Sequence, residues 1–111
     1  MEITALASCL DYARHAATTT LRDVEKQCQA VIRYGFHSAF VNPCFVVEAR
    51  QWLLETPAAV GTVISFPLGQ DSRDQKLMTA IDCVRKGADE LDISMNLGWF
   101  KEQKYKAWFW G

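Results

Sequence analysis

Apolar residues recur at helical spacing in the first third of the chain. Within residues 20–34 they occupy positions 21, 24, 28, 31 and 32. This spacing places them on one face of a helix. Thr19 or Thr20 is suited to cap the amino end of that helix, and Gly35 is suited to end it in a left-handed conformation. The pattern predicts an amphipathic helix over residues 20–34.

A similar pattern over residues 72–86 predicts another helix. Leu77, Ile81 and Val84 fall on one apolar face, and Gly87 ends this helix as Gly35 ends the earlier one. In both places a strand-like run follows the glycine. This repeated order of helix, glycine and strand indicates a weak internal repeat, which shared architecture explains better than duplication.

A third helix is predicted between these two, from residue 43 to about residue 55. Asn42 is expected to cap it and Pro43 to take the first helical position, while Thr56-Pro57 breaks it. Cys44 would then lie in the first turn of a helix. A thiol there can have a lowered pKa, although an inert cysteine is the commoner case.

Four short runs of strand-forming residues alternate with these helices, at residues 6–10, 36–41, 60–65 and 88–93. Parallel neighbours need crossover connections, so the alternation predicts an α/β fold with a parallel sheet covered by helices. A doubly wound open sheet and a (β/α)₈ barrel begin in the same way, and periodicity does not separate them. No G-x-G-x-x-G motif follows the first run, so a dinucleotide-binding sheet has no support.

The run over residues 88–93 carries the strongest candidate for chemistry. Its apolar Leu91 and Ile93 alternate with the polar Glu90, Asp92 and Ser94. In a barrel, Leu91 and Ile93 would pack on the helices while Asp92 points into the interior near the carboxyl rim, where barrel enzymes keep catalytic groups. A partly desolvated carboxylate there can transfer protons. An aspartate that bonds backbone amides at a strand end is the structural alternative.

Asp11 follows Leu10 at the end of the predicted first strand. We expect it to project from the same rim as Asp92, so that the two carboxylates converge on one site in a barrel. A turn aspartate is the alternative. The turn over residues 65–69 supplies an exposed aromatic side chain but no acid, base or nucleophile.

Five motifs occur in the order and at the spacings found in one enzyme family. They are YGF at 34–36, VNP at 41–43, VISFPLG at 63–69, GADELD at 87–92 and NLG at 96–98. On these motifs the chain resembles the bacterial deoxyribose-phosphate aldolases, from about Leu10 to Tyr105. A complete eight-unit barrel takes roughly 250 residues. The resemblance therefore implies the first four βα units of a TIM (β/α)₈ barrel, an incomplete barrel forming one partial domain over residues 1–111 with its fourth helix truncated at about 101–111.

The resemblance implies a class I aldolase that cleaves 2-deoxyribose 5-phosphate to glyceraldehyde 3-phosphate and acetaldehyde, a step of deoxyribonucleotide catabolism. In this family a lysine Schiff base acts as the electron sink, and no metal or cofactor is needed. By motif match Asp92 takes the family's proton-relay position and Asp11 a supporting acidic position. The Schiff-base lysine and the phosphate-binding loops belong to strands six to eight, so we expect none of them in this chain and no activity of the chain alone.

Two departures from the family pattern are visible. Residues 11–15 read DYARH, where family members usually have an Asp-His-Thr stretch, and Phe40 stands where many have a cysteine. Lys76 and Lys86 fall on a predicted helix, and Lys101, Lys104 and Lys106 fall in the tail. We expect all of these to be solvated surface groups with an ordinary pKa, which makes them poor nucleophiles.

Charge and composition argue against nucleic acid as a partner and against a membrane-spanning segment. Twelve basic against 13 acidic residues give a formal charge of -1, without the basic cluster that nucleic-acid binding requires. No apolar stretch reaches the roughly 20 residues that cross a bilayer, and no secretion signal is recognised at the amino end, so a cytoplasmic location is expected. The four cysteines form no C-x-x-C pair, and we expect reduced, mostly buried thiols.

The tail over residues 105–111 is dense in aromatics. Truncation is the favoured interpretation, and aromatics that cover a sheet edge or partner surface are the alternative. Two function classes therefore stay open. One is the amino-terminal half of an aldolase, active only with a carboxyl-terminal half; the other is a non-catalytic half-barrel that self-associates into a homo-oligomer.

Overall fold

The computed structural model describes residues 1–102 and contains one four-stranded sheet with helices between the strands. The strands are β1 (Asp11–Ala13), β2 (Ser38–Val41), β3 (Ala59–Ile64) and β4 (Glu90–Ile93). The helices are α1 (Ile3–Ala7), α2 (Leu21–Tyr34), α3 (Val46–Trp52), α4 (Arg73–Arg85) and α5 (Leu97–Lys101), with the 3₁₀ helix η1 (Pro43–Phe45) before α3. The lysines and aromatics predicted to form the tail beyond residue 102 lie outside the described residues.

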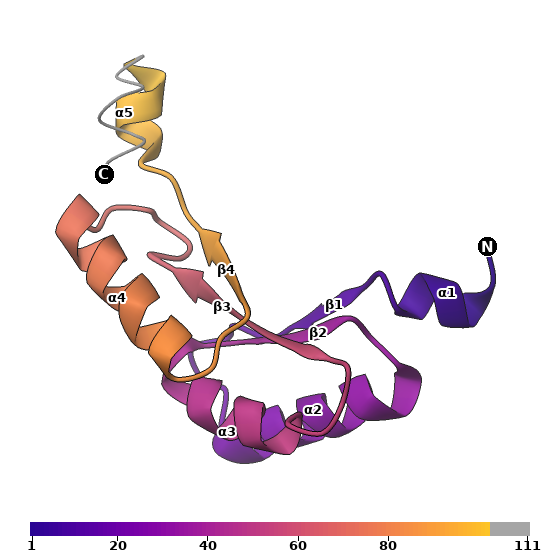
Figure 1. Cartoon of the computed structure of the whole chain (residues 1–111). Helices are drawn as coiled ribbons and strands as arrows, with labels where there is room; N and C mark the ends of the chain where they lie inside the picture. The colour runs from indigo at the N-terminus through magenta and orange to yellow at the C-terminus, as the bar shows by residue number, and fades with distance from the viewer. Residues whose placement is uncertain (103–111) are drawn as a thin grey trace.

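The sheet is parallel throughout, and its strands stand in sequence order, β1-β2-β3-β4. Helices α2, α3 and α4 all contribute to one core on the same side of this sheet, as Figure 1 shows. A doubly wound sheet would have helices on both faces. Sequential parallel strands with helices on one face are the arrangement of a barrel wall, so the α/β prediction is confirmed and the chain is a partial barrel.

The long helices begin and end as their sequences predict. Thr20 caps α2 and Ser72 caps α4, each in a capping box with the residue three positions on. Gly35 ends α2 with φ 69°, a left-handed conformation that glycine adopts without a Cβ penalty. These local signals lie within a few residues of one another, so the sequence alone was sufficient to place them.

The first strand differs from its prediction. Residues 6–10 were expected to be extended, but α1 and a turn take up this segment and β1 begins at Asp11. Asp11 pairs with Ser38, the first residue of β2, and the Leu10 carbonyl accepts a bond from the His37 amide at 2.8 Å. Because β2 begins at Ser38, residues before Leu10 have no neighbouring strand to pair with.

The helix predicted over residues 43–55 is also shorter than expected. Residues 43–45 form η1, and the α-helix runs only from Val46 to Trp52. The Asn42 side chain makes no capping bond to the following amides. It contacts the His15 ring at 3.2 Å and donates to the Ala16 carbonyl instead, so long-range contacts replace the predicted cap.

The core lies between the helices and one face of the sheet. It includes Val24, Cys28 and Val31 of α2, Leu53 after α3, and Val60 and Ile64 of β3. Cys28 and Cys83 are buried as predicted, whereas Cys9 and Cys44 are exposed, and all four are free thiols. Burial raises the pKa of the Cys28 thiol to about 11.

The buried side of α4 differs from its apolar pattern. Leu77, Ile81 and Val84 are all exposed, while Cys83 and the side chain of Lys76 are buried. Lys76 was predicted to be a solvated surface lysine, and that prediction is wrong. A long aliphatic stem can pack on apolar surface, which lets a lysine occupy the inner side of the helix and leaves the apolar stripe of α4 uncovered within residues 1–102.

Candidate active site

The two faces of the sheet are chemically different. Side chains alternate along each strand, and Ala39, Val41, Val60 and Ile64 point to the helix-covered core. The register then places a second set on the opposite, inner face: Asp11, Ala13, Ser38, Phe40, Gly61, Val63, Glu90 and Asp92. In a closed barrel this inner face would line the interior. The acidic residues predicted to carry chemistry therefore share one face.

Three titratable side chains meet at the amino end of this inner face. Asp11 begins β1, His37 precedes β2 and Glu90 begins β4. A carboxylate oxygen of Asp11, an imidazole nitrogen of His37 and a carboxylate oxygen of Glu90 all lie within 4.8 Å of one another. In a flat sheet β1 and β4 would lie about 14 Å apart, three strand spacings. The convergence of their side chains therefore reflects a curled sheet.

Short hydrogen bonds hold this cluster together. His37 Nε2 lies 2.7 Å from Glu90 Oε2, and the buried Ser38 hydroxyl donates to Asp11 Oδ1 at 2.6 Å. The hydrogen bond from the imidazole to Glu90, with a further contribution from the charges of Glu90 and Asp11, raises the pKa of His37. We refer to Asp11, His37 and Glu90 as the amino-end cluster.

Asp92 lies farther along the same face. It pairs in register with Val63, two positions beyond the Glu90–Gly61 pair, and its neighbour Leu91 packs against the core on the other face. Ile93, expected to pack on helices with Leu91, is instead 59% exposed. The Asp92 side chain is exposed, and no hydrogen bond or ion pair to its carboxylate occurs within residues 1–102.

The expected convergence of Asp11 with Asp92 is not what the contacts show. Asp11 is the first residue of β1, not a residue after its end, and it belongs to the amino-end cluster. The strand that was expected at residues 6–10 begins at Asp11, and this shift moves Asp11 from the carboxyl to the amino end. His37 and Glu90 were missed as partners because only the fold brings residues 53 positions apart into contact.

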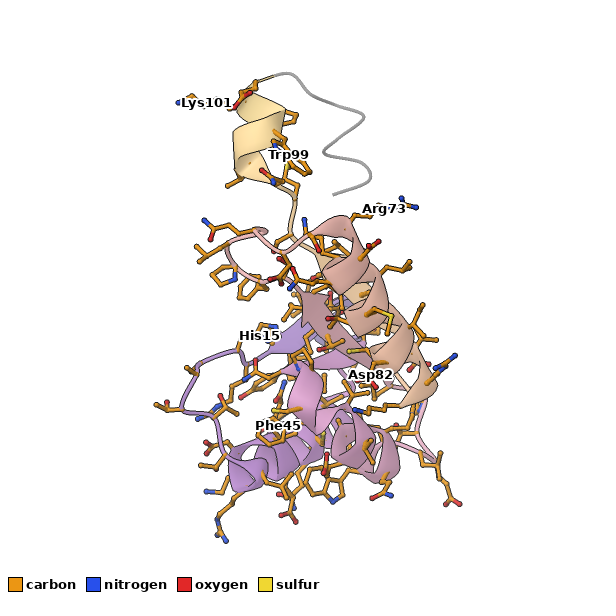
Figure 2. All side chains as sticks on the ribbon, turned by 90° about the vertical axis from the view of Figure 1, so that its left-hand side faces the viewer. His15, Phe45, Arg73, Asp82, Trp99 and Lys101 are labelled. Atoms are coloured by element: carbon orange, nitrogen blue, oxygen red, sulfur yellow. The ribbon has the colours of Figure 1, made fainter. Side chains whose placement is uncertain are left out.

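The loops that follow the strands contact one another at the carboxyl end of the sheet. His15, after β1, contacts Asn42, after β2, and its ring lies 5.3 Å from the Phe66 ring, after β3. Gly69 has φ 67°, and a Cβ there would collide with the backbone carbonyl of Met95, after β4. Figure 2 shows His15 close to this end of the sheet. We call the loops after β1, β2, β3 and β4 the carboxyl rim.

No lysine stands on the inner face within residues 1–102. Lys26 comes from α2, and Lys76 and Lys86 come from α4 and its end. Lys101 comes from α5, which stands away from the sheet with Trp99 (Figure 2). Lys86 lies 2.8 Å from Asp82, and that hydrogen bond raises the pKa of its amine. A protonated amine is a poor nucleophile, so the described residues offer a carboxylate for proton transfer but no amine for a Schiff base.

Comparisons with known proteins agree with the fold. No protein-family profile matches the chain. It is 40% identical to a deoxyribose-phosphate aldolase of Malacoplasma penetrans over 102 residues, which are 92% of this chain and 46% of that protein. It is 36% identical to a deoxyribose-phosphate aldolase of Aciduliprofundum boonei over 105 residues, 95% of this chain and 47% of that protein. The chain thus spans less than half the length of these curated relatives.

Solved structures also match most of this chain over less than half of their own length. A structure from Coccidioides immitis, provisionally assigned as a deoxyribose-phosphate aldolase, superposes with a TM-score of 0.94 at 33% identity, covering 98% of this chain and 43% of that one. The deoxyribose phosphate aldolase of Aeropyrum pernix, described as a tetramer, superposes with a TM-score of 0.86 at 29% identity, covering 96% and 45%. No helix within residues 1–102 is long and apolar enough to cross a membrane.

Proposed function

Because the chain is a relative of deoxyribose-phosphate aldolases that spans less than half their length, we propose that it supplies the proton-transfer part of such an aldolase site. The reaction in question cleaves 2-deoxyribose 5-phosphate to glyceraldehyde 3-phosphate and acetaldehyde. It belongs to deoxyribonucleotide catabolism, and a cytoplasmic location goes with it. Residues 1–111 act in it as one partial barrel domain.

One observation carries this proposal: Asp92 stands on the inner face of a barrel wall without a partner within residues 1–102. A carboxylate that is not committed to an ion pair is free to accept and return a proton through ordered water. In an aldol cleavage this proton moves at the carbon of acetaldehyde that becomes nucleophilic. Asp92 is therefore proposed as the proton relay.

Asp11 is proposed as a supporting residue of the same site. Its bond from the buried Ser38 hydroxyl fixes the carboxylate on the inner face. From there its negative charge contributes to the electrostatic potential inside the barrel. This is a positioning role, because Asp11 lies in the amino-end cluster.

The Schiff-base amine has to come from additional strands. None of the lysines within residues 1–102 stands on the inner face, and closure of the barrel would bring further strands beside β4 and β1. We expect the 111-residue chain by itself to show no aldol cleavage. It becomes active when a carboxyl-terminal half-barrel completes the site.

Complementation tests this function. The chain is mixed with a separately expressed carboxyl-terminal half of the Malacoplasma relative, and acetaldehyde release from 2-deoxyribose 5-phosphate is followed by coupled NADH oxidation. Activity is expected in the mixture and in neither half alone. A mixture that forms a complex by size exclusion but stays inactive would refute the proposal.

A second function is self-association without catalysis. Within residues 1–102, β1 and β4 each have only one neighbouring strand, so the sheet has two open edges that favour pairing. Large apolar side chains are exposed on β4 and in the segments after β3 and β4, namely Phe66, Leu68, Ile93, Met95 and Leu97. Two copies would provide eight parallel strands, the number in a barrel.

Light scattering after size exclusion separates this second function from the first. A self-associating half-barrel has twice the monomer mass, and Ile93→Lys at the β4 edge reduces the mass to that of a monomer. Leu21→Lys is the control, because Leu21 is also an exposed apolar residue but belongs to α2 and not to an edge strand. A chain that remains monomeric at high concentration is not a self-associating module.

A further inference from the structure

The amino-end cluster contains two side chains, His37 and Glu90, that the aldolase proposal leaves without a role. We propose that Asp11, His37 and Glu90 form a binding site for one divalent transition-metal ion, of the class of Zn²⁺ or Co²⁺. This site lies at the other end of the inner face from the carboxyl rim. It shares Asp11 with the proposed aldolase site, but it uses no substrate and does not involve Asp92, so ion binding can be measured without aldol cleavage.

The distances suit a single ion. Zn²⁺ binds nitrogen and oxygen ligands at about 2.0–2.2 Å in a tetrahedral arrangement, so its ligand atoms lie about 3.3–3.6 Å from one another. The candidate ligand atoms of Asp11, His37 and Glu90 are all within 4.8 Å of one another. Small side-chain rotations would bring them to bonding distance. The His37 Nε2 proton that now lies against Glu90 would leave the nitrogen when the ion binds.

Backbone pairing holds the main chain of the three ligand residues in place. The His37 amide donates to the Leu10 carbonyl at 2.8 Å, and the His37 carbonyl accepts from the Ala59 amide at 2.9 Å. His37 is thus held between β1 and β3. Asp11 and Glu90 are themselves strand residues, paired in register with Ser38 and Gly61, so ion binding requires little ordering of the main chain.

A hydrogen bond outside the ligand set orients one carboxylate. Ser38 is fully buried, and its hydroxyl donates to Asp11 Oδ1 at 2.6 Å. This bond leaves the other oxygen of Asp11 available to an ion. Partners of this kind orient ligands in established metal sites, and their loss typically weakens metal affinity by about 10–100-fold.

The charge of the cluster also favours a cation. Two carboxylates surround one imidazole, and within residues 1–102 no Lys or Arg forms a salt bridge with Asp11 or Glu90. With a neutral imidazole the cluster carries a charge of about -2. An imidazole nitrogen together with carboxylates selects transition metals over Mg²⁺ or Ca²⁺, which prefer sets made only of oxygen ligands.

Isothermal titration calorimetry with Zn²⁺ tests the site. Exposed thiols also bind Zn²⁺, so every protein in the series carries Cys9→Ser and Cys44→Ser, which change the two exposed cysteines. We expect one ion per chain. His37→Ala and Glu90→Gln should each weaken binding by at least about tenfold, and Ser38→Ala by about 10–100-fold.

A matched control uses the other histidine. His15→Ala removes the only other imidazole of the chain, keeps His37 and should leave the Zn²⁺ affinity unchanged. The absorption spectrum of bound Co²⁺ provides a second readout and should disappear in Glu90→Gln, which keeps the shape of the side chain. The proposal is wrong if no ion binds, or if His37→Ala and Glu90→Gln bind it as tightly as the parent chain.

Discussion

The two ends of the inner face use the same kinds of side chain in different ways. At the amino end, His37 bonds to Glu90 and Asp11 accepts from Ser38. Toward the carboxyl end, Asp92 has no such bond within residues 1–102, while backbone and ring contacts join the loops around it. Paired groups hold strands together, whereas an unpaired carboxylate is available for proton transfer. The comparison separates a polar cluster that organises the sheet from a group suited to chemistry.

Replacing Asp92 with asparagine should have the largest effect on function. In the complemented assembly we expect Asp92→Asn to lower the rate of aldol cleavage by about 10²–10⁴-fold, because the proton relay is lost. Stability should change by less than about 0.5 kcal/mol, since Asp92 is an exposed surface group. Coupled acetaldehyde detection and urea unfolding measure the two effects.

Glu25→Gln is the matched control for that variant. Glu25 is exposed on α2, on the outer side of the fold, so its change should leave both rate and stability unaltered. Equal activity of Asp92→Asn and the parent assembly would remove Asp92 from the mechanism.

The contacts of the carboxyl rim can be broken at Gly69. A Cβ at this position would collide with the Met95 carbonyl, and φ 67° disfavours any other residue. We expect Gly69→Ala to destabilise the fold by about 1–3 kcal/mol. Urea unfolding monitored by circular dichroism gives this value.

Gly98→Ala serves as the control for the rim. Among residues 1–102, a Cβ at Gly98, within α5, would meet only Asn96 Oδ1 at 3.4 Å. Alanine favours helix more than glycine does, so this variant should be neutral or more stable by up to about 1 kcal/mol. If both glycine variants lose stability equally, the contact between Gly69 and Met95 is not what holds the rim.

The smallest expected effect is a pH dependence of the unfolding free energy that arises from the amino-end cluster. The Glu90 hydrogen bond raises the pKa of His37 above its ordinary value of 6.5. The hydrogen bond between His37 and Glu90 therefore contributes its full stabilisation below pH 6.5. This contribution is lost as the pH rises through the higher folded-state pKa of His37. The contribution is small, because the side chains of His37 and Glu90 are 46% and 38% exposed.

Unfolding free energies of the parent and Glu90→Gln chains on both sides of that range test the sign. The difference between them should be larger at the acidic end and should shrink as the pH rises. A difference that grows with pH would mean that the imidazole is not the group being stabilised.

Local signals predicted much of the fold. The caps at Thr20 and Ser72 and the terminator Gly35 belong to single helices, so a short stretch of sequence contains all the information that they need. The shift of β1 to Asp11 could not be predicted in this way. It depends on where β2 begins, and that partner lies 27 positions away.

The candidate site could be predicted only in part, because local patterns place some of its residues and the overall fold places the others. Alternation along one strand indicated that Asp92 and Leu91 would face opposite sides. The cluster of Asp11 with His37 and Glu90 depends on the curl of the whole sheet. Burial of Lys76 likewise depends on which side of α4 meets the core, and the apolar pattern of that helix indicated the other side.

Borohydride trapping is the most direct test of the central claim, that this chain supplies the proton relay and other strands supply the amine. The complemented assembly is incubated with acetaldehyde and reduced with borohydride, and the intact masses of both polypeptides are measured. We predict one adduct on the carboxyl-terminal half and none on this chain. A stoichiometric adduct on a lysine of this chain would contradict the account.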